Sequence, residues 1–179
     1  VQTYRFCGDK ILQTHLFQLA GLPVPRTGIY YGPRQQSRIM DDFSPPFIAK
    51  IPRGSSRGLG VFMIRDQDQL SAFLKAHEPA YIQEYLPIVR DLRVVVLGRR
   101  IVHAYWREAL PGDFRNNVAQ GGRISFSKIP KAALNLALDT ANKCRFDHVG
   151  LDLCEHEGRW YLLEANMIFG LEGFVAAGL

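Results

Sequence analysis

Three oxygen-bearing side chains near the end of the chain could together hold a metal ion. Two apolar segments flank Gly158 and are expected to form a β-hairpin. Asp152 and Glu164 each lie six residues from Gly158, so the two face each other, and Asn166 shares the face of Glu164. Facing carboxylates repel unless a cation lies between them, and hard oxygen donors suit Mg²⁺. The alternative is a solvated polar face, which the like charges make less favourable.

A second candidate site combines a lysine with a glycine-rich loop. Lys50 lies in the apolar segment 47–51, and a loop of Gly, Ser and Arg residues follows it, including Ser55, Ser56 and Gly58. Backbone amides in such a loop can turn toward an anion, the hydroxyls donate further hydrogen bonds, and a strand-anchored ammonium adds a fixed charge. The pattern favours phosphate binding over its alternative, a surface hairpin tip with an exposed lysine.

Two more specific motifs can be excluded for this loop. A Walker A loop would need Gly-Lys-Ser/Thr and a following helix, and neither is present. The segment 54–58 matches Gly-x-Ser-x-Gly, which would make Ser56 a hydrolase nucleophile, but that motif requires a helix after the turn. Residues 59–64 instead have the apolar pattern of a strand. The hydrolase match is therefore interpreted as accidental.

Two further groups of polar residues carry weaker signals. The end of a predicted strand, where backbone groups could recognise the edge of a purine base, consists of Gln83, Glu84, Tyr85 and Leu86. A carboxylate, two guanidinium groups and amides occur in polar settings at Asp91, Arg93, Arg115, Asn116 and Asn117, and the guanidinium groups suit phosphate recognition. Taken singly, the first group is interpreted as an ordinary strand and the second as ordinary surface.

Helical and strand-like segments alternate along the chain, which predicts an α+β (mixed α/β) fold with six to eight strands. Helices are expected at 9–20, 66–77 and 130–143. Strands are expected at 47–51, 61–64, 81–85, 92–97, 101–106, 149–153 and 160–165, the first two forming a hairpin, as do 92–97 with 101–106. The first helix is expected to present one apolar face, formed by Ile11, Leu12, His15, Leu16 and Leu19.

The composition is that of a globular protein. Of 179 residues, 47% are hydrophobic and 22% charged, and no apolar run is long enough for a membrane span, so a cytoplasmic location is expected. A net charge of +5 and a pI near 9.3 favour anionic partners. Three scattered cysteines suggest neither a disulfide framework nor a zinc site.

Taken together, these motifs resemble those of the ATP-grasp superfamily, and most closely the RimK-type ligases that attach glutamate to a carboxylate acceptor. The resembling residues occur in family order over nearly the whole chain. They are Asp9-Lys10, Gly21 to Pro25, Lys50 with the glycine loop, Gln83 to Tyr85, Asp91 to Arg93, Asp113 to Asn117, Gly121-Gly122, Asp152, Glu164 to Asn166 and Gly170 to Gly173. The chain departs from the family after Asn166, where Met167-Ile168-Phe169-Gly170 replaces a small residue followed by Ser-Pro-Gly.

The resemblance implies an ATP-grasp fold with two lobes and ATP between them. An N-terminal helix would occupy residues 1–21, the first lobe 22–85 and the second lobe 86–179. The implied cofactors are ATP and Mg²⁺, with Mn²⁺ as a substitute. In the implied reaction ATP phosphorylates a carboxylate, giving ADP, and the amine of glutamate or another amino acid then displaces phosphate to form an amide.

The resemblance also assigns roles to individual residues. Catalytic roles near the transferring phosphoryl group fall to Arg115 and Asn117. Nucleotide-binding roles fall to Lys10, Lys50, Ser55, Ser56, Gly58, Gln83, Glu84, Tyr85, Leu86, Asp91, Arg93 and Asn116, in addition to Arg115 and Asn117. The metal ligands would be Asp152, Glu164 and Asn166.

Two alternatives stay open. One is an ATP-grasp ligase acting on a small peptide or cofactor precursor, and the other is a nucleotide- or RNA-binding module without ligase activity, which the basic pI would suit. Expected partners are amino-acid and carboxylate substrates, either small molecules or a protein tail. A membrane partner is not expected, nucleic acid is disfavoured, and a homo-oligomer is compatible with the sequence.

Overall fold

The computed structural model describes residues 6–54, 60–108 and 123–179. The chain forms two compact units: residues 25–86 make one, and residues 1–24 together with 87–179 make the other. Within the described residues, no helix is long and apolar enough to cross a membrane.

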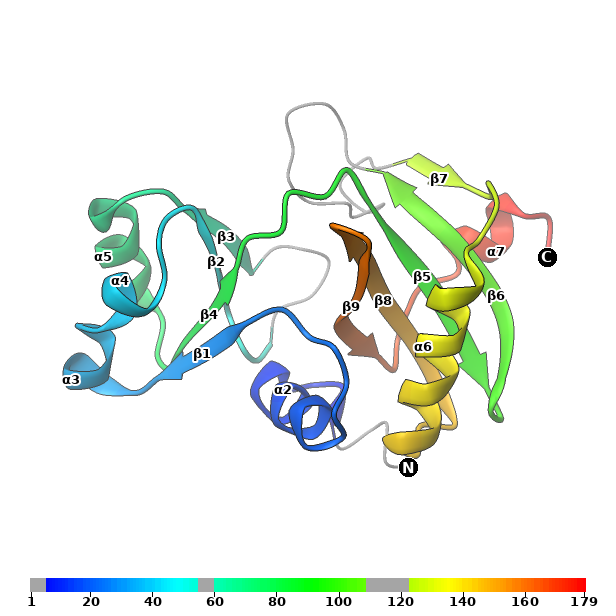
Figure 1. Cartoon of the computed structure of the whole chain (residues 1–179), viewed down its shortest axis with the longest axis horizontal. Helices are drawn as coiled ribbons and strands as arrows, with labels where there is room; N and C mark the ends of the chain where they lie inside the picture. Colours follow the sequence, from blue (N-terminus) through cyan, green and yellow to red (C-terminus); the bar gives the residue numbers. More distant parts are fainter. Residues whose placement is uncertain (1–5, 55–59, 109–122) are drawn as a thin grey trace. The chain divides into compact units, whose positions relative to one another are not determined.

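The unit of residues 25–86 is built on an antiparallel four-stranded sheet (Figure 1) with the order β1-β4-β2-β3. Its strands are β1 (Thr27–Tyr30), β2 (Phe47–Lys50), β3 (Val61–Ile64) and β4 (Ala80–Glu84). Its helices are α3 (Gly32–Gln36), α4 (Ile39–Asp42) and α5 (Gln67–Ala76). Asp66 caps α5 by accepting a hydrogen bond from the N–H of Gln69.

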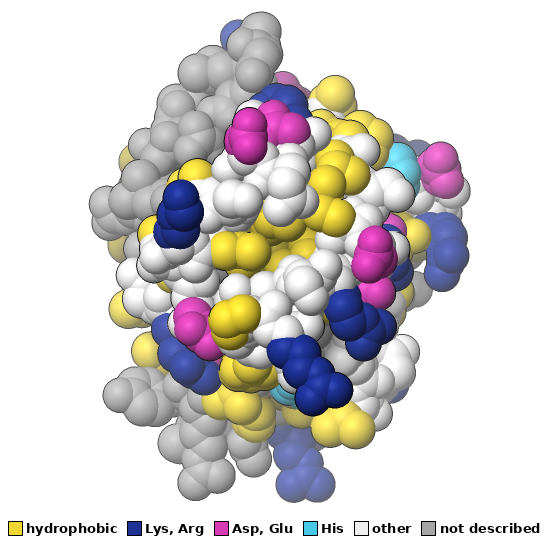
Figure 2. Space-filling view, turned by 90° about the vertical axis from the view of Figure 1, so that its left-hand side faces the viewer, with side chains coloured by type: hydrophobic (Ala, Val, Ile, Leu, Met, Phe, Trp, Pro, Cys, Tyr) yellow, Lys and Arg dark blue, Asp and Glu magenta, His cyan; other side chains and the backbone are white. Residues whose placement is uncertain are grey.

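The core of this unit lies between the helices and one face of the sheet. Ile39 of α4 and Leu70 and Phe73 of α5 pack in one cluster with sheet residues that include Phe47 and Ile82. Figure 2 looks onto the side of this unit that carries the three helices, where hydrophobic side chains gather in a hollow among charged ones. Ala49 and Ile82 belong to this core, and Lys50 and Gln83 are the residues that follow them in β2 and β4. Because side chains alternate along a strand, Lys50 and Gln83 point to the other face of the sheet.

The second unit contains an antiparallel five-stranded sheet (Figure 1) with the order β7-β6-β5-β8-β9. Its strands are β5 (Arg90–Leu97), β6 (Arg100–Glu108), β7 (Arg123–Ser125), β8 (His148–His156) and β9 (Arg159–Asn166). Its helices are α2 (Lys10–Leu19), α6 (Lys131–Lys143) and α7 (Glu172–Ala176).

Strand alternation separates the two faces of this sheet. Leu92, Val94 and Leu151 join the buried cluster that includes Ala137 of α6 and Phe17 of α2. The opposite face of β5, β6 and β8 carries four charged side chains. All four are buried, and they are Asp91, Arg93, Arg107 and Asp152. The polar candidate site is therefore formed on one face of a sheet whose other face supports it.

The predicted α+β class and the predicted hairpins are confirmed. The described residues contain nine strands, more than the six to eight expected. One reason is that β1 is short and contains Gly28, so it lacks the alternating apolar pattern that marks a strand.

The predicted apolar face of α2 is wrong. Leu12 and Leu19 are 45% and 88% exposed, whereas Gln13 and Thr14 are buried beside Ile11. The inward face combines Ile11 and Phe17 with Gln13, whose side chain makes two hydrogen bonds to the backbone of β9. A count of apolar residues does not detect the polar part of this face.

Candidate functional site

The predicted pairing of Asp152 with Glu164 is confirmed, but a bulge is needed to produce it. The hairpin turn consists of Glu157 and Gly158, both with positive φ. A regular ladder from this turn would place Asp152 opposite Leu163. A β-bulge between Asp152 and Leu153 shifts the register by one residue, so Asp152 pairs with Glu164.

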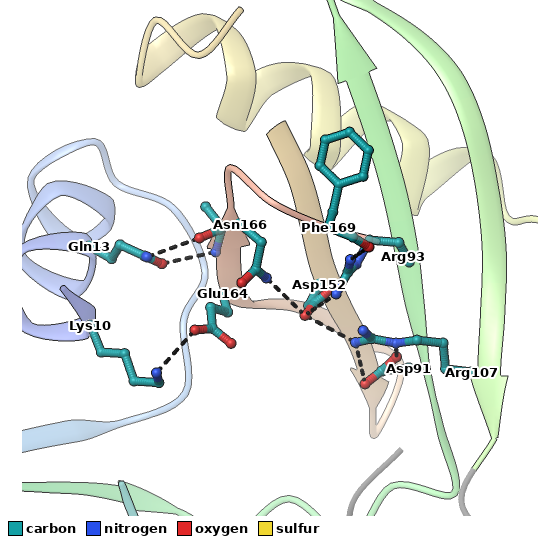
Figure 3. Close-up of polar contacts among 10 residues, drawn as sticks. Lys10, Gln13, Asp91, Arg93, Arg107, Asp152, Glu164, Asn166 and Phe169 are labelled. Carbon is teal, nitrogen blue, oxygen red and sulfur yellow. Dashed lines mark hydrogen bonds and ion pairs between the residues drawn. The ribbon is translucent and has the colours of Figure 1, made fainter. Parts of the chain in front are cut away.

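The charge of Asp152 is balanced by two arginines (Figure 3). Arg93 pairs with it through Nε and, at 3.1 Å, through Nη2. Arg107 Nη2 lies 3.0 Å from Asp152 Oδ2, and the Asn166 amide donates to the same oxygen at 3.3 Å. Asp152 therefore already has counter-charges from the protein, so its pairing with Glu164 does not by itself require a metal ion.

Lys10 of α2 supplies a counter-charge to Glu164. Lys10 Nζ lies 3.2 Å from Glu164 Oε1 (Figure 3), and the Glu164 side chain is 30% exposed. With Asp91, the cluster holds three acidic and three basic side chains and has no net charge. A neutral cluster can accept a metal ion together with an anionic phosphate without burying a large excess of one charge.

Arg107 is the member of this cluster that the sequence analysis missed. Its guanidinium forms a two-point contact with Asp91, with Nε–Oδ1 at 2.6 Å and Nη2–Oδ2 at 2.9 Å. Asp91 and Arg107 lie eight residues to either side of Arg99 and pair across the hairpin. The symmetric count that found Asp152 and Glu164 would therefore also have found this pair.

The two buried aspartates differ in acidity. Burial raises the pKa of Asp91 to about 6, and the nearby Arg107 reduces this rise without cancelling it. Burial also acts to raise the pKa of Asp152, but Arg107 and Arg93 outweigh it and hold that pKa below its usual value. Asp152 therefore stays ionised at neutral pH, as its predicted role as a metal ligand requires.

The donor set fits a hard cation only if the amide takes part. The described residues include no group of three His, Cys, Asp or Glu side chains that could hold a metal. Asp152, Glu164 and Asn166 supply two carboxylates and one amide oxygen, and Figure 3 shows them at neighbouring positions. Such oxygen ligands suit Mg²⁺, which usually completes its shell with water and phosphate oxygens.

A second group of candidate residues lies in the unit of residues 25–86. Lys50 Nζ donates to Gln83 Oε1 at 2.7 Å, and the Gln83 amide donates to Thr27 Oγ1 at 3.0 Å. Gln83 is only 5% exposed, so it fixes the direction of the Lys50 ammonium. Glu84 is held by the N–H of Arg26, which donates to Oε1 at 2.6 Å.

The remaining predicted residues are not tested by these contacts. Tyr85 and Leu86 follow β4 and are partly exposed. The predicted residues outside the described ranges are Ser55, Ser56, Gly58, Arg115, Asn116 and Asn117. Their roles stay predictions.

Phe169, in the segment that departs from the ATP-grasp pattern, contacts Arg93 of this charged cluster. Its carbonyl accepts a hydrogen bond from Arg93 Nη1 at 2.7 Å, and its ring lies 5.1 Å from that of His148. Its Cβ would be only 2.4 Å from a Cβ at Gly150, so this position of β8 requires glycine. The sequence marks Phe169 as unusual but does not reveal these contacts.

The family model described as "RimK-like ATP-grasp domain" matches residues 7–178, almost the entire chain. The chain belongs to the RimK-like ATP-grasp family. Among curated relatives of this ATP-grasp chain, the ribosomal protein bS6–L-glutamate ligase of Escherichia fergusonii is 31% identical over 172 residues. A probable alpha-L-glutamate ligase of Citrobacter koseri is 30% identical over the same length. Each alignment covers 92% of this chain but 57% of the relative, so the chain spans little more than half their length.

Solved structures show the same ATP-grasp fold. A RimK domain protein of Sphaerobacter thermophilus matches with a TM-score of 0.77 and 19% identity, covering 98% of this chain and 65% of that one. D-alanine–D-alanine ligase of Bacillus anthracis also gives a TM-score of 0.77, with 15% identity over 98% of this chain and 64% of the ligase. The expected ATP-grasp fold is thus confirmed.

Proposed function

We propose that this ATP-grasp chain binds ATP with Mg²⁺ and catalyses the ligation of an amino acid, with glutamate as the first candidate, to a carboxylate acceptor. The observation that carries the proposal is the cluster of Asp152, Glu164 and Asn166 on one sheet face beside three basic side chains. Family membership supports the same chemistry, since two curated relatives are named as glutamate ligases.

In this proposal the residues around Lys50 and the cluster around Asp152 have different roles. Lys50, oriented by Gln83, contacts the phosphates, and the residues from Gln83 to Leu86 bind the adenine base. Asp152, Glu164 and Asn166 hold Mg²⁺, which supplies charge neutralisation for the phosphates when bound. Arg115 and Asn117 are assigned to the transferring phosphoryl group.

The proposed reaction needs no covalent intermediate on the protein. An oxygen of the acceptor carboxylate attacks the γ-phosphorus, the bond to the β-phosphate oxygen breaks, and ADP leaves. The amine of the second substrate then attacks the acyl phosphate, inorganic phosphate leaves, and the amine loses a proton as the amide forms. Positioning and charge neutralisation dominate phosphoryl transfer, so the balanced charges of this cluster are suited to it.

The acceptor class is tested by measuring ADP formation. Glutamate is combined with a panel of carboxylates that includes peptides with a free C-terminus and small carboxylic acids. We expect ATP turnover only when a carboxylate and an amine are both present. Turnover with small acids alone would favour the ligase for a peptide or cofactor precursor. Salt-sensitive RNA binding with Mg-independent nucleotide binding would favour the non-catalytic module.

Replacing Lys50 by Met is expected to weaken ADP and ATP binding roughly 10-fold or more. The substitution keeps the apolar stem and removes the ammonium, and hydrogen bonds to charged groups contribute about 1.5–3 kcal/mol. Adenosine affinity should stay unchanged, because adenosine carries no phosphate. Isothermal titration calorimetry with all three ligands measures this.

The matched control is Lys75→Met, which removes an exposed lysine of α5 in the same unit. An equal loss of affinity for adenosine and ADP in Lys50→Met would show that Lys50 supports the adenine pocket or the fold instead of the phosphates.

A further inference from the structure

Gln13 on α2 binds the backbone of a strand 152 residues away in sequence. Its Oε1 accepts a hydrogen bond from the Ala165 N–H at 2.9 Å, and its Nε2 donates to the Ala165 carbonyl at 3.0 Å (Figure 3). Gln13 is 2% exposed and Ala165 is fully buried, so water cannot readily replace either contact.

The Gln13 amide takes the place of a neighbouring strand. Among the described strands, β9 is at the edge of its sheet and pairs with β8 alone. In an antiparallel pair, alternate residues direct their backbone groups away from the partner strand, and in β9 Ala165 does so toward α2. A glutamine amide has one carbonyl acceptor and an N–H donor, so it satisfies both groups as a strand would.

These two hydrogen bonds hold the peptide groups that lead to the candidate metal ligands. The Ala165 N–H belongs to the peptide that joins it to Glu164, and its carbonyl belongs to the peptide that joins it to Asn166. Because side chains alternate along a strand, Glu164 and Asn166 point to the same side while Ala165 points into the core. Fixing both peptide planes therefore fixes the direction of both ligands.

We propose that Gln13 is a positioning residue that orients Glu164 and Asn166 for the metal ion. This proposal rests on the metal site of the proposed function. Helix α2 acts at this site twice, because Lys10, one turn before Gln13, contacts the Glu164 carboxylate itself. Gln13 touches neither metal nor substrate. Its loss should therefore weaken metal binding through ligand geometry while every ligand is still present.

The test is the Mg²⁺ concentration that gives half-maximal ADP binding, measured by calorimetry for Gln13→Met. We expect this concentration to rise roughly 10-fold, the usual size of an outer-shell effect on metal affinity. Excess Mg²⁺ should restore full ADP affinity, because the three ligands remain. Hydrogen exchange of the Ala165 amide in the metal-free protein should become faster.

Two controls separate positioning from stability. Gln18→Met makes the same change at an exposed position of the same helix. Phe17→Leu destabilises the packing of α2 but leaves in place the two side-chain hydrogen bonds from Gln13 to Ala165. Both should leave the Mg²⁺ requirement unchanged, although Phe17→Leu lowers the melting temperature. If Gln13→Met does not fold, Gln13→Asn shortens the side chain by one methylene, and the same rise is expected.

The inference fails if Gln13→Met binds ADP with the wild-type Mg²⁺ requirement, or if Phe17→Leu raises that requirement equally. Glu164→Gln, measured in parallel, distinguishes this failure from that of the metal site itself. If Glu164→Gln raises the requirement and Gln13→Met does not, the metal site stands and the positioning role is wrong. If neither variant raises it, the metal site and the role of Gln13 fail together.

Discussion

The Arg107→Met variant is expected to lose about 3–5 kcal/mol of unfolding free energy, the usual effect of removing one partner from a buried ion pair. Arg107 is 8% exposed and contacts both Asp91 and Asp152. Without it, Asp91 would lose its two-point partner inside the protein, and Asp152 would keep its contacts with Arg93 and Asn166. Urea denaturation at pH 8 measures the change.

The loss of stability in Arg107→Met should be smaller at pH 5 than at pH 8. Burial already raises the pKa of Asp91 to about 6 in the folded protein, above its value in the unfolded chain. Removing Arg107 raises it further, so as the pH falls from 8 to 5 the folded variant gains more stability from protonation of Asp91 than the wild type does. In the variant, folded Asp91 binds a proton that the unfolded chain does not bind at these pH values. The unfolding free energy of the variant therefore increases toward pH 5.

Arg100→Met, which removes an exposed arginine from the same strand, is the matched control and should change stability little. The double variant Asp91→Asn with Arg107→Met should recover part of the loss, since it removes the buried carboxylate that lost its partner. A loss under 1 kcal/mol in Arg107→Met at pH 8 would show that solvent reaches these carboxylates and that the cluster is not a buried network.

The Glu164→Gln variant is expected to raise the Mg²⁺ requirement for ADP binding more than about 10-fold while it stays folded. It removes the charge of a proposed ligand with almost no change in volume, and a direct ligand should matter at least as much as an outer-shell partner. The Lys10–Glu164 ion pair is partly exposed, so its loss should cost at most about 1 kcal/mol.

Glu157→Gln, in the turn of the same hairpin, makes the same charge change far along the strand from Asp152. Its Mg²⁺ requirement should equal that of the wild type. Identical Mg-dependent ADP binding in Glu164→Gln and wild type, with both proteins folded, would remove Glu164 from the metal site.

Those parts of the site that follow from strand alternation could be predicted from the sequence. Glu164 and Asn166 share a face because they are two residues apart, and this required no knowledge of packing. The pairing of Glu164 with Asp152 was predicted correctly, but by a count that did not include the actual turn and bulge. The count about Gly158 reached the right partner because the bulge beside Asp152 offset the two-residue turn, and a sequence does not show where a strand will bulge.

Contacts between elements distant in sequence could not be predicted. Gln13 is polar and was not part of the predicted apolar face of its helix, yet it is buried and makes two hydrogen bonds to Ala165. The charges on Asp152 and Glu164 suggested a cation because the arginines and Lys10 that balance them come from other elements. A prediction that considers one hairpin alone overestimates its unbalanced charge.

The fate of oxygen in the acceptor carboxylate tests the proposed reaction most directly. The protein is incubated with ATP, Mg²⁺, glutamate and an acceptor carboxylate labelled with ¹⁸O, and the products are analysed by mass spectrometry. An acyl-phosphate route transfers one ¹⁸O atom to inorganic phosphate, forms ADP and leaves the protein unlabelled. Unlabelled phosphate, AMP with pyrophosphate, or a phosphorylated residue on the chain would contradict the account.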